Sequence, residues 1–210
     1  MIEIIDYGLQ MALITFCINA SVLYMMRMGN RQKAWILLIL TGTDYLLGDL
    51  YWTLFLIFYG ETAPFSYIPY LSWYTCYIFL FLLVAEVRSE RRERKFRPLL
   101  LIVPAFTGGM CIFFLQWGDV IGNTFTVVLR TLPMWQALDG LLAIRDGQEK
   151  KEKRFFFLAV MAFCLAEYGT DTASCFWMGD TIRNPYFWID MVLAATFVVF
   201  PRALRKAVEQ

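Results

Sequence analysis

Seven apolar stretches, each long enough to cross a lipid bilayer, constrain the fold of this chain more than any other feature. They span residues 7–26, 34–59, 67–87, 98–117, 124–144, 155–177 and 185–202. A helix needs about 20 mostly apolar residues to cross the hydrocarbon core. Because every backbone polar group in lipid must be hydrogen-bonded within the protein, such stretches fold as helices. The sequence predicts an all-α polytopic membrane protein, a single seven-helix transmembrane domain over residues 1–210.

Composition agrees with this prediction and excludes several functions. The chain is 59% hydrophobic, more than a soluble domain of 210 residues can bury. The net charge is +1, and Lys and Arg gather in short loop runs, which argues against nucleic-acid binding. There is no histidine, so the commonest general base and zinc ligand is absent. The five cysteines stand singly within apolar stretches, so we expect no disulfide, metal or other cofactor.

Basic residues alternate from loop to loop. Most of the Lys and Arg lie in the runs 27–33, 88–97 and 145–154 and in the C-terminal tail. The positive-inside rule therefore predicts a multi-pass protein of the cell membrane with its N-terminus outside and its C-terminus in the cytoplasm. The run from Glu90 to Lys95 is expected to determine topology and contact lipid headgroups. Since acidic residues precede the first apolar stretch, we expect a retained helix and no signal peptide.

Acidic residues within the apolar stretches are the main functional signal. Hydrocarbon offers no water to a carboxylate, so such residues usually face the bundle interior and mark a ligand site or a pathway. Counting residues along the helices places four charged groups from four helices in one outer layer. They are Asp49, Arg130, Asp171 and Asp190. We predict that they face a polar cavity open to the outside, with Arg130 as the one deep cation.

Three more acids lie deeper and predict a proton relay or ion path. Asp44 and Glu167 fall near the midplane, and Asp139 falls in the inner third of the fifth helix. The alternative is that these acids are protonated, or pair with Arg130 or hydroxyl groups, and only hold the helices together. So many acids against one arginine favour a functional cavity.

Aromatic residues crowd the same outer half of the bundle. Carboxylates beside aromatic faces suit an organic cation, which both attract. We expect Trp52, Trp73 and Tyr74 to wall the ligand site, with packing in the bundle core as the alternative. For the outermost aromatics, among them Trp117 and Trp177, the alternative is an interfacial belt.

Parts of the second and third helices resemble a known class of membrane sensor. The segments are Gly48-Asp49-Leu50-Tyr51-Trp52-Thr53, Phe58-Tyr59-Gly60-Glu61-Thr62 and Leu71-Ser72-Trp73. They are similar to the multi-helix sensor region that precedes signalling modules in Gram-positive bacteria, particularly Clostridia. The resemblance implies a receptor with a cytoplasmic signalling partner. The chain ends at Gln210 without an output module, so we expect a stand-alone sensor subunit or another use of the same bundle.

Two further families share part of the pattern. The layout is similar to that of microbial rhodopsins, whose last helix carries Asp-x-x-x-Lys with the retinal lysine. Here the matching run is Asp190-Met191-Val192-Leu193-Ala194, and alanine has no amine, so retinal binding is contradicted. Intramembrane aspartyl proteases carry Gly-x-Gly-Asp, to which Gly48-Asp49 and Gly169-Thr170-Asp171 correspond only in part.

Three functions follow as hypotheses. The first is a receptor or sensor that binds a small cationic or amine-bearing ligand in the outward-facing cavity. The second is a small-molecule or proton-coupled transporter, for which Gln136 and Asp139 extend the polar residues toward the inner side. The third is an intramembrane hydrolase, which needs two acids within hydrogen-bonding reach. We expect a binding protein in preference to an enzyme, and a cavity reaching one face only distinguishes a receptor from a carrier.

The predicted orientation can be tested with single cysteines. Introduced at Thr62 or Gly122, they are expected to react with a membrane-impermeant thiol reagent added to intact cells, because both positions lie in outer loops. A cysteine at Gln148 is expected to react only after the membrane is permeabilised. Labelling of position 148 in intact cells would reverse the orientation.

Overall fold

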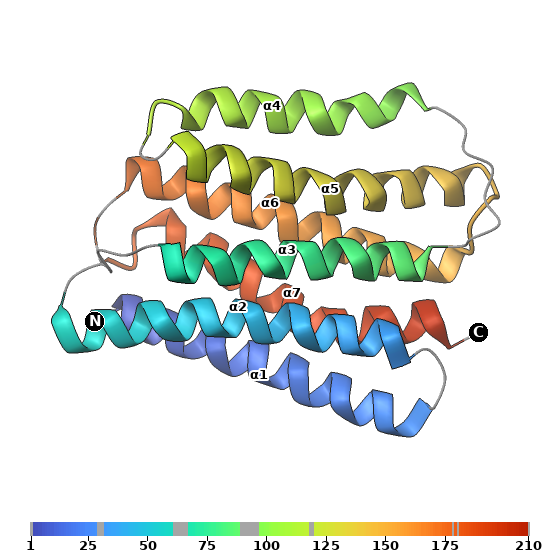
Figure 1. Cartoon of the computed structure of the whole chain (residues 1–210), viewed down its shortest axis with the longest axis horizontal. Coiled ribbons are helices and arrows are strands. Elements are labelled where there is room, and N and C mark those ends of the chain that lie inside the picture. The colour runs from blue at the N-terminus through green and yellow to red at the C-terminus, as the bar shows by residue number, and fades with distance from the viewer. Residues whose placement is uncertain are drawn as a thin grey trace.

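The structure is a computed structural model of an all-helical chain (Figure 1). It describes residues 2–28, 32–60, 67–88, 97–117, 120–177, 179 and 181–209. The predicted turn at 61–64, the basic run at 90–95 and parts of the other predicted loops lie outside these residues. The described part of the chain holds seven α-helices and no strand. They are α1 (Ile2–Met28), α2 (Gln32–Tyr59), α3 (Tyr67–Val87), α4 (Ile102–Phe114), α5 (Val120–Arg145), α6 (Arg154–Phe176) and α7 (Pro185–Val208).

Every predicted stretch contains one of these helices, but some of the predicted bounds are wrong. The first helix begins at Ile2 and not at residue 7, and the last continues to Val208. The fourth is shorter than predicted, because its first residues form a 3₁₀ segment, η1 (Pro98–Leu101), and the chain turns after Phe114. A hydropathy pattern identifies only the apolar part of a helix. It does not include polar residues at the ends, although these continue the same backbone hydrogen bonds.

Six of the helices pack side by side in a closed ring. Around the ring, α1 contacts α2, α2 contacts α3, α3 contacts α5, α5 contacts α6, α6 contacts α7, and α7 returns to α1. Helix α4 lies outside the ring and packs on α5, at the top of Figure 1. We call the end of the bundle where α1 begins the N-terminal end and the opposite end the C-terminal end. The ring surrounds an interior to which all six helices contribute.

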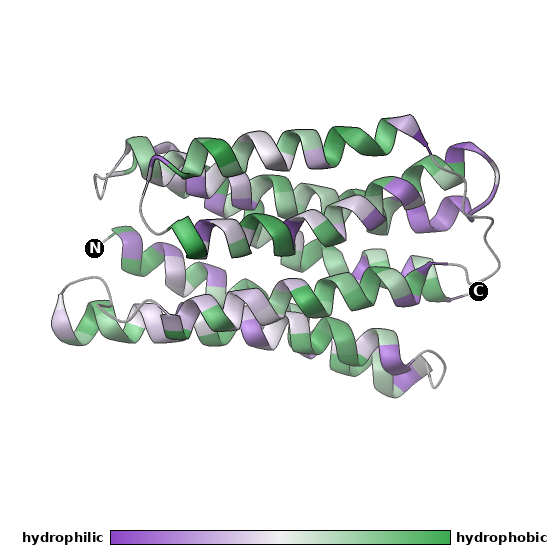
Figure 2. Cartoon of the chain, turned by 45° about the horizontal axis from the view of Figure 1, so that its top comes forward, coloured by the Kyte–Doolittle hydropathy of each residue, from purple (hydrophilic) through white to green (hydrophobic). Residues whose placement is uncertain are grey.

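Polarity is distributed as in a membrane protein. Figure 2 shows hydrophilic residues gathered at the C-terminal end of the bundle and hydrophobic residues along much of each helix. Each helix exposes large apolar side chains, for example Phe16, Leu47, Leu82, Ile112, Val128, Leu165 and Val192. Acids such as Asp49 and Asp190 are buried instead. This arrangement suits a bundle whose surroundings are hydrocarbon.

Five helices in the described residues are long and apolar enough to cross a membrane: α1, α3, α5, α6 and α7. Helix α2 is long enough, but Asp44, Asp49 and the threonines and glycines beside them lower its hydropathy. Helix α4 has 13 residues, which at 1.5 Å per residue is about 20 Å, shorter than the hydrocarbon core. The structure therefore has the helices of a membrane protein, with five that meet the criteria for a full span.

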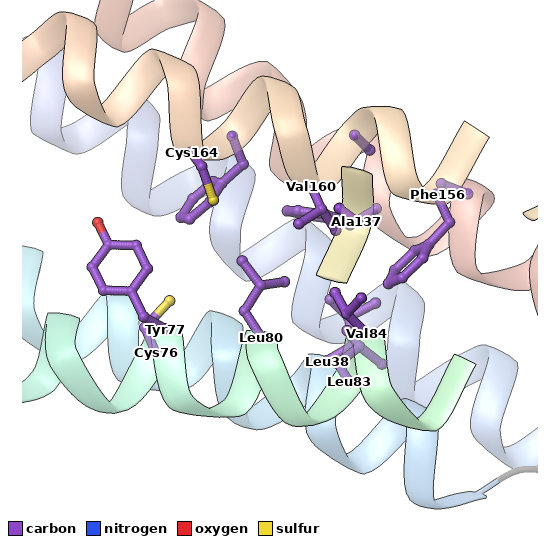
Figure 3. Close-up of a cluster of buried hydrophobic side chains, with 14 of the residues drawn as sticks. Leu38, Cys76, Tyr77, Leu80, Leu83, Val84, Ala137, Phe156, Val160 and Cys164 are labelled. Carbon is purple, nitrogen blue, oxygen red and sulfur yellow. The ribbon is translucent and has the colours of Figure 1, made fainter. Parts of the chain in front are cut away.

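Apolar side chains fill the interior of the ring toward the C-terminal end. Figure 3 shows the side chains of α2, α3, α5 and α6 converging there, with Leu80 and Val84 of α3 facing Val160 and Phe156 of α6. All of these, and Phe163, Phe197 and Phe200 beside them, are buried. Buried apolar side chains therefore occupy this part of the interior.

Two helix ends illustrate how the chain changes direction. Asn184 begins α7 by accepting a hydrogen bond from the backbone N–H of Tyr186 at 3.0 Å, and Pro185 follows in the first turn. Gly147 ends α5 with a φ of 71°, in the left-handed region that favours glycine. The backbone N–H of Gln148 then donates to the carbonyl of Ala143 at 2.8 Å, closing the last turn.

The close contact between α5 and α6 depends on a glycine. A Cβ atom added at Gly140 would lie 2.5 Å from Cε2 of the buried Phe157. We expect Gly140→Ala to lower the free energy of unfolding by about 1–3 kcal/mol, as overpacking does. The matched control is Gly109→Ala on α4, where an added Cβ meets nothing within 4 Å and alanine favours the helix. Thermal unfolding in detergent compares them, and equal melting temperatures would contradict the close packing.

Candidate functional site

A cavity of about 400 Å³ lies inside the ring, toward the N-terminal end of the bundle. Polar residues from all six ring helices line it: Gln10, Asp49, Trp73, Arg130, Glu167 and Asp190. Its floor is formed by Tyr45 and Tyr77, which are buried, and Tyr70 and Trp117 at the opposite side are partly exposed. The cavity is thus closed by the apolar interior toward the C-terminal end and open toward the N-terminal end.

Arg130 is the most highly connected charged residue of the site. It is 5% exposed, and its Nε donates to the hydroxyl of Tyr77 at 2.8 Å. One terminal nitrogen donates to Oε2 of Glu167 at 2.8 Å, and the other donates to Oδ2 of Asp171. Its guanidinium carbon also lies 5.2 Å from the ring centroid of Tyr77 and 5.3 Å from that of Tyr168. Two carboxylates, one hydroxyl and two aromatic rings together satisfy this buried cation.

Asp49 enters the cavity wall through a close contact between α2 and α3. Oδ1 of Asp49 accepts a hydrogen bond from the indole nitrogen of Trp73 at 3.2 Å. This requires a small residue at position 48, since an added Cβ on Gly48 would lie 2.5 Å from that nitrogen. The Gly48-Asp49 pair noted in the sequence therefore serves the approach of Trp73 to the helix.

Asp190 lies on the opposite side of the cavity, where α7 meets α1. Its Oδ1 accepts a hydrogen bond from the side-chain amide of Gln10 at 3.1 Å. The Asp190 carboxyl group also lies within hydrogen-bonding reach of Asp6 on α1. Both aspartates are buried. The predicted single acid of α7 is thus part of a pair.

Several carboxylate oxygens at the cavity have no hydrogen-bond donor from the described residues. They include Oδ2 of Asp49, Oδ2 of Asp190 and Oε1 of Glu167, each with less than 1 Å² of its surface exposed. No ion pair among the described residues involves Asp6, Asp49 or Asp190, whereas Glu167 is paired with Arg130. Buried carboxylate oxygens without donors are costly unless a proton or a cation satisfies them.

The structure brings most of the predicted site residues together. Asp49, Arg130, Asp171 and Asp190, counted into one layer, all line this cavity, and so do Trp73 and Tyr74. The hydroxyl of Tyr74 donates to the carbonyl of Gly122 at 3.1 Å and joins α3 to the start of α5. Trp52 is not among the lining residues and packs instead on Trp73, with ring centroids 6.2 Å apart.

The three acids predicted as a relay lie in three different environments. Glu167 pairs with Arg130 at the cavity. Asp44 is partly buried and does not line the cavity. Asp139 lies toward the C-terminal end, where Arg97 donates to its Oδ1 at 2.9 Å and Arg88 to its Oδ2 at 2.5 Å. The structure does not bring the three acids together.

Arg130, predicted as the one deep cation, is not the only buried cation among the described residues. Arg97 and Lys153 are also buried. Arg97 donates to Asp146 at 2.7 Å and to Gln148 at 2.6 Å as well as to Asp139, and its bond to Asp146 lowers the pKa of that carboxyl group. Lys153 pairs with Glu149 at 2.8 Å. Sequence reasoning placed these residues in surface basic runs, because it could not foresee that Arg97 meets the end of α5 and that Lys153 pairs with Glu149.

Sequence reasoning also missed Asp6 and Gln10 on α1 and the tyrosines Tyr7, Tyr45, Tyr77 and Tyr186. Asp6 precedes the predicted first helix, so it was counted as an outer flank. The signal that would have included it is periodicity, since Asp6 and Gln10 are four residues apart and share one face of a helix. The tyrosines resemble any other interior aromatic until their hydroxyl groups are placed.

The described residues offer no group of three or more Cys, Asp or Glu side chains arranged to hold a metal ion. Comparison of the chain with protein-family models, curated proteins and solved structures finds no match. Function must therefore be argued from the cavity itself.

Removal of Arg130 is expected to destabilise the bundle more than removal of any acid that it binds. Arg130→Ala leaves the buried Glu167 and the adjacent Asp171 uncompensated, with a loss of about 3–5 kcal/mol in the free energy of unfolding. Asp171→Asn is expected to cost less, because Glu167 still pairs with Arg130. Thermal unfolding in detergent measures both. If Arg130→Ala is no less stable than Asp171→Asn, Arg130 is not the counter-ion of the bundle.

A double variant separates the lost charge pair from lost packing. Arg130→Met combined with Glu167→Gln removes the buried charge together with its partner, and it is expected to be more stable than Arg130→Met alone. Additive effects of the two substitutions would indicate that the residues do not interact.

Proposed function

We propose that this protein is a membrane receptor or sensor-type protein that binds a small organic cation, such as an amine, in the cavity of its helical ring. The observation that supports this most is the pair of acids Asp49 and Asp190, which line the cavity, are buried and have no basic partner among the described residues. A ligand ammonium group would satisfy the oxygens that the protein leaves without donors.

The charges of the cavity are divided between two sides. On the side of α5 and α6, Arg130 already compensates Glu167 and Asp171. On the side of α1, α2 and α7, no cation of the described residues compensates Asp49 and Asp190. We therefore place the ammonium group on this second side and not beside Arg130, because like charges would repel.

The remaining wall suits the organic part of such a ligand. Trp73, Tyr70 and Tyr74 stand together on one face of α3, with the rings of Tyr70 and Trp73 5.6 Å apart. Aromatic faces attract cations and pack against apolar groups. The volume of about 400 Å³ lies within the range of small-molecule sites.

A receptor agrees with the cavity better than a carrier does. The lining residues come from the N-terminal end of the bundle, and packed side chains such as Leu80, Val84 and Phe156 separate them from Asp139. A carrier needs a polar path to both sides. The hydrolase hypothesis has less support, because Asp49 and Asp171 bond to different groups, Trp73 and Arg130.

The native thiol of Cys175 provides a test that needs no known ligand. Cys175 lines the cavity and is partly exposed, and Cys17, Cys76 and Cys164 are buried. In a Cys111→Ala background, we expect a cationic methanethiosulfonate to modify Cys175 about tenfold faster than an anionic one, after correction for their rates with a free thiol. With the N-terminal end facing outward, as predicted, this preference for the cationic reagent should be observed when the reagents are added to intact cells.

Matched variants assign the preference to its acids. Asp49→Asn and Asp190→Asn are expected to reduce the preference for the cationic reagent. Asp44→Asn, on the same helix as Asp49 but away from the cavity, should leave it unchanged. Equal or faster reaction of the anionic reagent would overturn the proposal of a cation site.

A further inference from the structure

Asp6 and Asp190 form a pair of buried acids in the wall between α1 and α7. They are 3% and 2% exposed, and their carboxyl groups lie within hydrogen-bonding reach of each other. An ionised carboxylate only accepts hydrogen bonds, so a bond between two carboxyl groups requires a proton on one of them. The contact itself therefore calls for one proton.

The hydrogen-bond inventory leads to the same requirement. Without that proton, both oxygens of Asp6 and Oδ2 of Asp190 would be buried with no donor from the described residues. Gln10 supplies one donor, and it is directed to Oδ1 of Asp190. Two adjacent buried carboxylates cannot both carry their charge at acceptable cost.

Apart from Gln10, whose amide stabilises ionised Asp190, the groups around the pair favour retention of the proton. On α1 these are Glu3 and Tyr7, on α2 Asp49, on α6 Glu167 and on α7 Tyr186. Every one is an acid or a phenol. Their negative charge, where ionised, raises the cost of a second ionisation at the pair.

The pair also borders the cavity through only one of its members. Asp190 lines the cavity, whereas Asp6 is not among the lining residues. A cation that reaches Asp190 therefore meets a carboxyl group whose proton is shared with the residue behind it. Positive charge at that place lowers the cost of ionising both acids.

We propose that Asp6 and Asp190 hold one proton between them and that a cation entering the cavity displaces this proton to the solvent. The second half of this proposal, displacement of the proton by a cation, rests on the proposed cation site. The first half, the shared proton, does not. One cation is bound and one proton is released, so the charge of the site is conserved. It follows that cation affinity rises with pH, by at most about tenfold per pH unit over the range in which the pair exchanges its proton.

Infrared spectroscopy of the purified protein tests the first half. A buried carboxylic acid gives a C=O stretching band that a carboxylate lacks. We expect this band at neutral pH, a shift of it on labelling of aspartate with ¹³C at the carboxyl carbon, and its loss in both Asp6→Asn and Asp190→Asn. Asp44→Asn is the control and should retain it. Because the ¹³C label is measured in the wild-type protein, the test remains valid if a variant fails to fold. Absence of a label-sensitive band in the wild-type protein would overturn the proton pair.

A tethered cation tests the second half. In the Cys111→Ala background, modification of Cys175 with an aminoethyl methanethiosulfonate places an ammonium group in the cavity, and a methyl methanethiosulfonate gives the neutral control. We expect the ammonium to shift the pH at which the band disappears to lower values, relative to the control.

The outcomes distinguish this inference from the proposed function. An unchanged titration with the tethered ammonium would overturn proton displacement, even where Cys175 still prefers cationic reagents. If Cys175 shows no preference for cationic reagents but the carboxylic-acid band is present, the cation site is overturned and the proton pair is still supported.

Discussion

The guanidinium of Arg130, buried inside the ring, is the interaction on which the rest of the site depends. It joins three helices, because its partners are Tyr77 on α3 and Glu167 and Asp171 on α6, while the arginine itself belongs to α5. A buried cation is tolerated only when such partners surround it. By satisfying the acids of one side, Arg130 leaves those of the other side, Asp49 and Asp190, as the uncompensated charges of the cavity. The preference for a cationic ligand follows from this asymmetry.

The ring also differs along its length. Toward the N-terminal end its interior holds polar groups around a cavity, and toward the C-terminal end it holds buried aromatic and aliphatic side chains. Beyond the packed region, Arg97 connects Asp139 with Asp146 and Gln148. Apart from Asp44, the deep acids of the sequence therefore belong to two clusters of different character. One is fully paired with arginines, and the other retains carboxylate oxygens without donors.

Helices and site differed in how far the sequence could predict them. All seven helices were predicted, because long apolar stretches in a membrane protein have no other way to satisfy the backbone. Depth counting placed Asp49, Arg130, Asp171 and Asp190 in one layer, because the rise of a helix is constant, and all four line the cavity. It failed for Trp52, whose side chain lies behind Trp73, and for the partners of Asp139. Depth along an axis does not determine which neighbour a side chain meets.

The sequence by itself determined that this chain forms apolar helices and where they begin and end to within six residues. Hydrophobicity and the helical repeat are local properties, so a single sequence carries them. Only the tertiary structure decided that six helices close into a ring with α4 outside, that Arg130 binds Glu167 as well as Asp171, and that Asp6 lies against Asp190. Those contacts join residues far apart in the chain, up to 184 positions for Asp6 and Asp190, and they depend on the rotation and order of the helices. Apolar surfaces, which pack in many orientations, do not specify these on their own.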